Sequence, residues 1–182
     1  MQNTRRFPPA GFFAFAGAAL FVIAMPSVGW AAPTPKPIGT FGDWSAYTLN
    51  EGKAKTCYIV SHPKSMEPKG AKRGEVSILV SHKQGDKGKG EINVNGGYNY
   101  KKGSKVELAV EKERFDLVTF DKPGYLDSAF AAEGKDDAVV AALEKGQKAV
   151  VKGTSDKGSA TTDTYSLNGV GAALKAIWSA CK

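Results

Sequence analysis

The stretch VELAVEKERFDLVTF, residues 106–120, shows the pattern that decides the fold. Apolar residues recur at every second position of 106–110 and again from Phe115 to Leu117, on either side of a charged turn at 111–114. Side chains of a strand point alternately to its two faces, so this period is typical of strands with one buried face. Two such strands joined by a short turn predict an antiparallel hairpin.

The same pattern continues on both sides of this hairpin. Together the segments suggest about seven or eight short strands, which favours an antiparallel sandwich because a parallel sheet needs a helix after each strand. Residues 128–132 allow either a buried strand or an exposed apolar patch, and the strand is favoured. Residues 63–72 are expected to form a basic loop. The other predicted strands are 41–47, 56–62, 75–82, 92–94 and a hairpin of 148–154 with 161–167.

Two helices are predicted among the strands. The first covers 136–145, where an Asp opens the segment and Gly146 follows it. The second covers 170–180, with one apolar stripe that carries Cys181 toward the core. We therefore expect a mainly β protein, an antiparallel β-sandwich with one short helix and a C-terminal helix.

The first residues have the order of a secretory signal peptide. Arg5 and Arg6 precede an uncharged apolar run at 11–25, and small residues lead up to Ala31. We expect residues 1–31 to be cleaved after Ala31. The alternative is a membrane anchor, but the run is shorter than the roughly 20 residues that span a bilayer. The mature protein is then periplasmic or secreted, with no transmembrane segment.

The mature chain is expected to hold one domain. Residues 32–39 are a Pro-rich, extended and mobile leader, and residues 40–182 form a single β-sandwich domain. Cleavage removes two basic residues and no acidic one, which leaves 23 basic and 18 acidic residues and a net charge of +5. This charge favours contact with an anionic surface, although lysines scattered among acidic residues are more simply explained by solubility.

The chain has two cysteines, Cys57 and Cys181. An isolated pair in an oxidising compartment usually forms a disulfide, here worth roughly 4–5 kcal/mol in the chain-entropy model. Two free thiols or a metal pair are the alternatives. His62 and His82 are the only histidines, and neither has ligand-like neighbours at regular spacing, so we expect no metal.

Residues that carry catalysis are not apparent. His62 and His82 lie in no nucleophile motif. Asp136 and Asp137 stand where a helix N-terminus favours negative charge, so capping is their expected role. The glycine-rich segment 85–90 lacks the strand–loop–helix setting of a phosphate loop. We expect no catalytic residue, no cofactor and no nucleic-acid partner.

Tyr98 and Tyr100, with asparagines around them, are candidates for a contact surface toward a glycan or a protein. The simpler alternative is an edge hairpin with one tyrosine facing inward. The partner would be an unknown macromolecule, and the oligomeric state is open.

Several motifs together resemble the invasion-associated locus B family of periplasmic and surface proteins from alphaproteobacteria. The resemblance covers about residues 40–182. The motifs are Gly42-Asp43-Trp44, Cys57 on the next strand, Arg73-Gly74, the run DTYSLNGVGAALKAI at 163–177, and Ala180-Cys181.

This resemblance implies an immunoglobulin-like β-sandwich, export, and a virulence-associated role in host-cell entry for pathogenic members. It implies no enzyme activity. We therefore expect an exported non-enzymatic envelope or secreted protein that interacts with host cells or envelope components. The alternative is a periplasmic accessory protein for envelope stability or assembly.

Overall fold

The computed structural model describes residues 33–182. The predicted signal peptide, residues 1–31, and its cleavage after Ala31 lie outside the described residues. The strands are β1 (Lys36–Phe41), β2 (Trp44–Glu51), β3 (Ala54–Ser61), β4 (Ser65–Glu67), β5 (Ser77–Lys83), β6 (Glu91–Asn95), β7 (Val106–Val110), β8 (Glu113–Thr119), β9 (Ser128–Ala131), β10 (Lys148–Thr154) and β11 (Ala160–Ser166). The helices are α1 (Asp136–Lys145) and α2 (Val170–Ala180).

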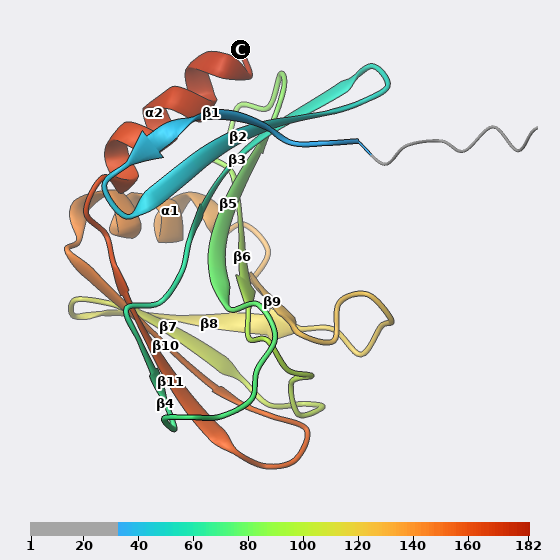
Figure 1. The fold of residues 1–182 in the computed structure, drawn as a ribbon, viewed down its shortest axis with the longest axis vertical. Coiled ribbons are helices and arrows are strands. Elements are labelled where there is room, and N and C mark those ends of the chain that lie inside the picture. The colour runs from blue at the N-terminus through green and yellow to red at the C-terminus, as the bar shows by residue number, and fades with distance from the viewer. Residues whose placement is uncertain (1–32) are drawn as a thin grey trace, which may run out of the picture. The chain divides into compact units, whose positions relative to one another are not determined.

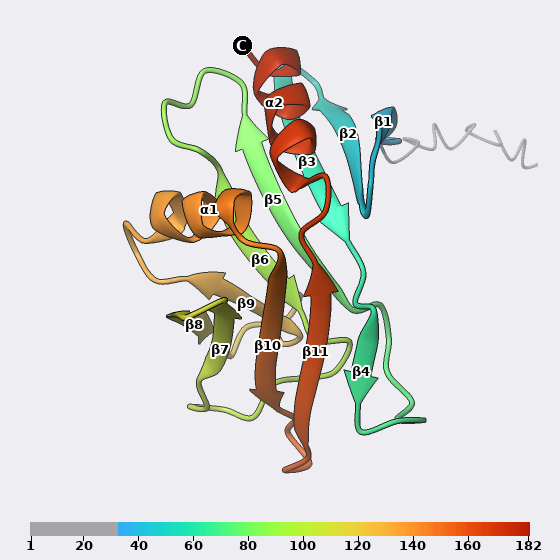
Figure 2. The same ribbon diagram turned by 90° about the vertical axis from the view of Figure 1, so that its left-hand side faces the viewer.

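All strands belong to one continuous sheet in the order β1-β2-β3-β5-β6-β9-β8-β7-β10-β11-β4. Every pairing between neighbours is antiparallel. Figure 1 shows that β2, β3 and β5 run in a different direction from β7, β8 and β10. In Figure 2 the strands β10, β11 and β4, which end the sheet on the side of β7 and β8, are seen next to one another. The mainly β antiparallel fold is confirmed, and its two halves remain hydrogen-bonded through β6 and β9.

The hairpin of residues 106–120 is present as β7 and β8. Val106 pairs with Leu117, and Val110 pairs with Glu113. Val106 and Leu108 are fully buried, as the two-residue period predicted. The predicted strand at 128–132 is present as β9, which joins β8 to β6. Its first half is buried, with Ala129 fully so, whereas Phe130 is partly exposed, so the apolar-patch alternative applies to Phe130.

Both predicted helices are present with the expected limits, but the capping prediction for α1 is wrong. Lys135 is the N-cap residue, and no side chain caps the helix. Asp136 Oδ1 instead accepts a hydrogen bond from Ile92 N at 2.9 Å, and Asp137 Oδ1 accepts one from Lys89 N at 2.6 Å. The two carboxylates therefore attach α1 to β6 and to the segment that precedes it.

Helix α2 packs against β1, β2 and β3 and ends at the disulfide. Cys57 on β3 and Cys181 are bonded, with 6.0 Å between their Cα atoms, and both are fully buried. This confirms the predicted pair. The apolar stripe of α2, with Leu174 and Ile177 fully buried, places Cys181 over the sheet.

Two segments differ from the sequence-based expectation. Residues 36–39, predicted to belong to a mobile leader, form the first part of β1 and pair with β2. Pro37 is compatible with this because an edge strand leaves one row of backbone donors unused. Residues 65–67, predicted to be loop, form β4, a three-residue edge strand on β11. Such a short, exposed strand has no alternation that a sequence pattern can reveal.

Candidate functional site

Tyr98 and Tyr100 follow β6 and meet each other edge to face, with ring centroids 5.1 Å apart. Tyr100 is only 7% exposed and belongs to the core, whereas Tyr98 is partly buried. The Tyr98 hydroxyl lies 2.6 Å from Thr161 Oγ1 on β11. Of the two predicted contact residues, only Tyr98 is therefore within reach of a partner. The inward-facing alternative describes Tyr100.

Two glycines make room for these rings. A Cβ on Gly153, in β10, would lie 2.6 Å from the Tyr98 hydroxyl oxygen and 2.8 Å from the Tyr100 ring. A Cβ on Gly96 would lie 2.8 Å from Tyr100 Cζ. All three distances are shorter than a van der Waals contact, so any side chain at these positions would displace a ring.

A buried ion pair that sequence reasoning missed lies beside Tyr98. Arg73 donates two hydrogen bonds of 2.6 Å to the two carboxylate oxygens of Asp163 on β11. It also donates to the Gly96 carbonyl at 2.9 and 2.7 Å. The two side chains are 5% and 3% exposed. The guanidinium carbon lies 5.0 Å from the Tyr98 ring centroid, a cation–π distance. Both residues stand in the family motifs, the one signal that pointed to them.

Burial and charge act together on these groups. Burial opposes the charge on Arg73 and is the largest single influence, but the hydrogen bonds and the charge attraction to Asp163 together outweigh it, and the pKa of the guanidinium is raised. Burial raises the pKa of Tyr98, partly offset by Thr161 and Arg73. It also raises the pKa of Tyr100 and of Tyr165. The cluster therefore holds one compensated charge pair among neutral phenols.

A cleft of 360 Å³ opens above this cluster. Arg73 and Tyr98 form part of its floor, and two exposed lysines, Lys72 and Lys157, come from different loops beside it. Neither lysine forms an ion pair with a described residue. We call this the basic cleft; its remaining lining residues are Pro68, Ala71, Asn99, Ser155, Asp156, Ser159 and Thr161.

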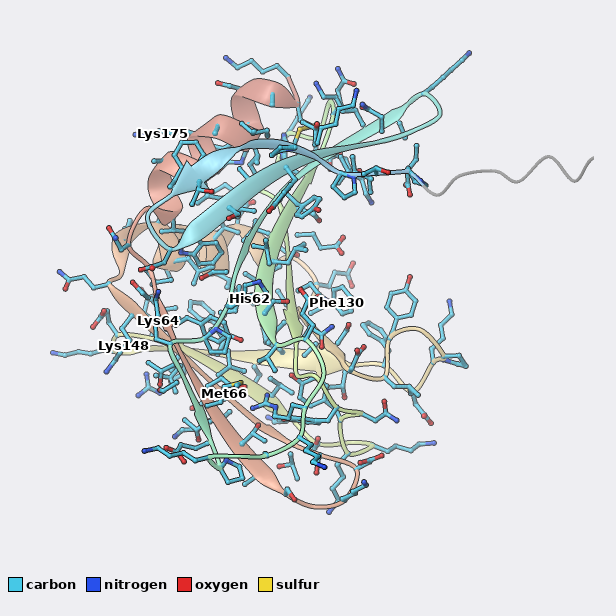
Figure 3. All side chains as sticks on the ribbon, in the orientation of Figure 1. His62, Lys64, Met66, Phe130, Lys148 and Lys175 are labelled. Atoms are coloured by element: carbon cyan, nitrogen blue, oxygen red, sulfur yellow. A yellow bond between two sulfur atoms is a disulfide. The ribbon has the colours of Figure 1, made fainter. Side chains whose placement is uncertain are left out.

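The histidines lie apart from the basic cleft and from each other. His62 Nδ1 is 3.0 Å from the Val76 carbonyl, and Figure 3 shows this residue near the middle of the molecule. His82 pairs in register with Cys57 and is 6% exposed, with no hydrogen-bond partner for Nδ1 among the described residues. In residues 33–182 no group of three or more His, Cys, Asp or Glu side chains could hold a metal ion.

The remaining family motifs pack against each other. Asp43 N donates to the Asn168 carbonyl at 3.0 Å, and Trp44 Nε1 donates to the Ser166 carbonyl at 3.1 Å. Gly169 has a φ of 90°, and a Cβ there would overlap the Phe41 carbonyl. The Gly-Asp-Trp segment and the Ser-Leu-Asn-Gly segment thus join β2 to the end of β11. These conspicuous motifs hold the fold together.

Residues 44–178 match the family model described as invasion associated locus B (IalB) protein. The chain belongs to the IalB family. A solved IalB-like fold, invasion associated protein B from Bartonella henselae, is similar over 81% of this chain and 97% of that one, with a TM-score of 0.57 and 18% identity. No curated protein matches the chain. Within residues 33–182, neither helix is long and apolar enough to cross a membrane.

Proposed function

We propose that this IalB-family protein is exported and works by binding, with the basic cleft as its contact surface for an anionic macromolecule of the envelope or of a host cell. The observation that carries the proposal is the placement of Lys72 and Lys157 around a cleft whose buried charge, Arg73, is already compensated by Asp163. The two lysines are free to attract an anion, while Arg73 remains committed to the fold.

The chemistry around the lysines suits recognition more than reaction. Tyr98 contributes an aromatic side chain to the lining, and Asn99 and Ser159 offer hydrogen-bond donors and acceptors beside the lysines. Positive charge at a partly enclosed surface raises the local concentration of anionic partners and accelerates encounter. Asp156 at the same cleft limits the net charge and favours partners whose anionic groups are spaced apart.

Binding to heparin at two salt concentrations tests this function. We expect a Lys72→Gln, Lys157→Gln double variant of residues 32–182 to bind several-fold more weakly than wild type at low salt, because two charge contacts are lost. Wild-type binding should also weaken as salt increases. A Lys53→Gln, Lys175→Gln variant removes two exposed lysines elsewhere and should bind as wild type does; Figure 3 labels Lys175 on α2. Equal losses in the two variants would contradict a specific cleft.

Export is tested separately on the native protein. Its mass after fractionation of the cells should correspond to a chain that begins at Ala32 and contains one disulfide. A cytoplasmic protein that retains residues 1–31 would refute the exported part of the proposal.

A further inference from the structure

Exposed apolar side chains gather on β8, β9 and the loop between them. Four large hydrophobic side chains are exposed in residues 33–182, and three of them, Val118, Phe120 and Tyr125, lie here at 44, 48 and 44%. Phe130 on β9 pairs in register with Val118 and joins the group. We call this group, the three aromatic residues Phe120, Tyr125 and Phe130 together with the neighbouring Val118, the aromatic platform. Figure 1 shows the β8–β9 connection extending away from the sheet.

The rings of the aromatic platform contact each other. The Phe120 and Phe130 centroids are 5.6 Å apart at an interplanar angle of 66°, and the Tyr125 and Phe130 centroids are 6.1 Å apart at 52°. Phe130, labelled in Figure 3, therefore connects the two exposed rings. A contiguous exposed patch of this kind marks an interaction surface more often than single scattered apolar residues do.

A groove of 380 Å³ runs along the platform and has a polar rim. Glu91 from β6 and Asp136 from α1 place carboxylates on it, and Lys122 places an ammonium group there. The Lys122 nitrogen lies 5.5 Å from the Tyr125 ring centroid. Asp136 uses Oδ1 for Ile92 N, while Oδ2 accepts no hydrogen bond from a described residue.

This mixture of charges selects the ligand. Two carboxylates disfavour an anionic lipid surface or polyanion, and an apolar protein partner would have to bury Glu91 and Asp136 without partners, which is costly. The apolar face of a sugar ring stacks on an aromatic side chain, and its hydroxyls both donate and accept hydrogen bonds. Hydroxyl donors suit the two carboxylates, and hydroxyl acceptors suit Lys122.

We propose that the aromatic platform binds an uncharged saccharide. Sugar rings lie over Tyr125 and Phe120, and their hydroxyls reach Glu91, Asp136 and Lys122. This site is separate from the basic cleft, and it takes a neutral ligand, so its binding is expected to depend little on salt.

Saturation-transfer NMR with maltohexaose, cellohexaose and chitohexaose tests the proposal. At least one of the three should receive saturation from wild-type protein at its ring protons. Its dissociation constant should rise about tenfold or more in Tyr125→Ala and in Phe120→Ala, because each removes a stacking surface. Lys122→Gln should weaken binding less, because the glutamine amide still donates. The Lys72→Gln, Lys157→Gln variant should bind the sugar as wild type does. The proposal for this site can therefore be refuted without refuting the one for the basic cleft, and the reverse.

Tyr47→Ala is the matched control, because Tyr47 is a partly exposed aromatic residue stacked on Tyr58 in another part of the sheet. Its binding should equal that of wild type. The proposal is overturned if none of the three oligosaccharides receives saturation, or if Tyr125→Ala and Tyr47→Ala weaken binding equally. Sedimentation with phosphatidylglycerol vesicles that Tyr125→Ala abolishes would overturn it in favour of a lipid surface.

Discussion

The molecule contains two aromatic clusters with opposite surroundings. Tyr98 and Tyr100 lie against a buried ion pair and are enclosed by glycines, so any change there disturbs the interior. Phe120 and Tyr125 lie at the surface, where their side chains are 48% and 44% exposed. The comparison teaches that an aromatic pair beside asparagines is weak evidence of a surface, because the surroundings decide which ring reaches solvent.

We call Tyr98 and Tyr100 the inner cluster. The largest loss of stability is expected when the ion pair beside this cluster is broken. Asp163→Asn leaves Arg73 buried without its counter-charge, which should lower the free energy of unfolding by about 3–5 kcal/mol. Urea denaturation followed by tyrosine and tryptophan fluorescence measures this loss.

Asp116→Asn is the control for that substitution. Asp116 pairs with Lys105 at 2.7 Å, but both side chains are largely exposed. Little change in stability is expected. If Asp163→Asn lowers the free energy of unfolding as little as the control does, the inner cluster tolerates an unpaired charge and does not behave as a buried region.

Alkaline pH should destabilise the folded chain through Tyr100 of the inner cluster and through Tyr165, which lies on β11 and is fully buried. Burial raises the pKa of Tyr100 and Tyr165 in the folded chain, whereas the unfolded phenols titrate near pH 10. Below about pH 10 the phenols are neutral in both states. At higher pH the unfolded chain loses protons that the folded chain keeps, so stability falls by about 1.4 kcal/mol per pH unit for each phenol.

Urea denaturation between pH 9 and pH 11 measures this dependence. Tyr165→Phe is the matched variant, because the Tyr165 hydroxyl has no hydrogen-bond partner among the described residues and its loss costs no bond. In this variant the free energy of unfolding should fall less steeply with pH, because one buried phenol no longer contributes. If absorbance at 295 nm shows that all six tyrosines of the chain ionise before unfolding, the inner cluster is open to solvent.

The smallest effects concern the glycines. Gly153→Ala places a methyl group against the Tyr98 and Tyr100 rings and should destabilise the protein by about 1–3 kcal/mol. Gly171→Ala lies in α2, where the new Cβ would be 3.7 Å from Glu144 Cγ, an ordinary contact. It should stabilise the helix by roughly 0.5–1 kcal/mol. Thermal unfolding compares the two; an unchanged or raised unfolding midpoint for Gly153→Ala would contradict the tight fit at Gly153.

Sequence reasoning predicted most of the fold and little of the site. The period of two around Val106 and Leu108, and the apolar stripe of α2, are local patterns with direct structural meaning. By contrast, β4 and the Arg73–Asp163 pair depend on segments distant in the chain, and 90 positions separate the two charged residues. The capping prediction for Asp136 was wrong because Ile92 N, a tertiary partner, captured its carboxylate.

By itself the sequence determined that the chain alternates as strands do, that its two helices begin and end where they do, and that Cys57 has Cys181 as its one possible partner within the chain. These follow from local sterics, side-chain direction and composition. Only the tertiary structure decided that Tyr100 is buried while Tyr125 is exposed, because solvent access depends on which distant strands cover a residue. The same is true of the basic cleft and the aromatic platform, whose residues meet only after the sheet is complete.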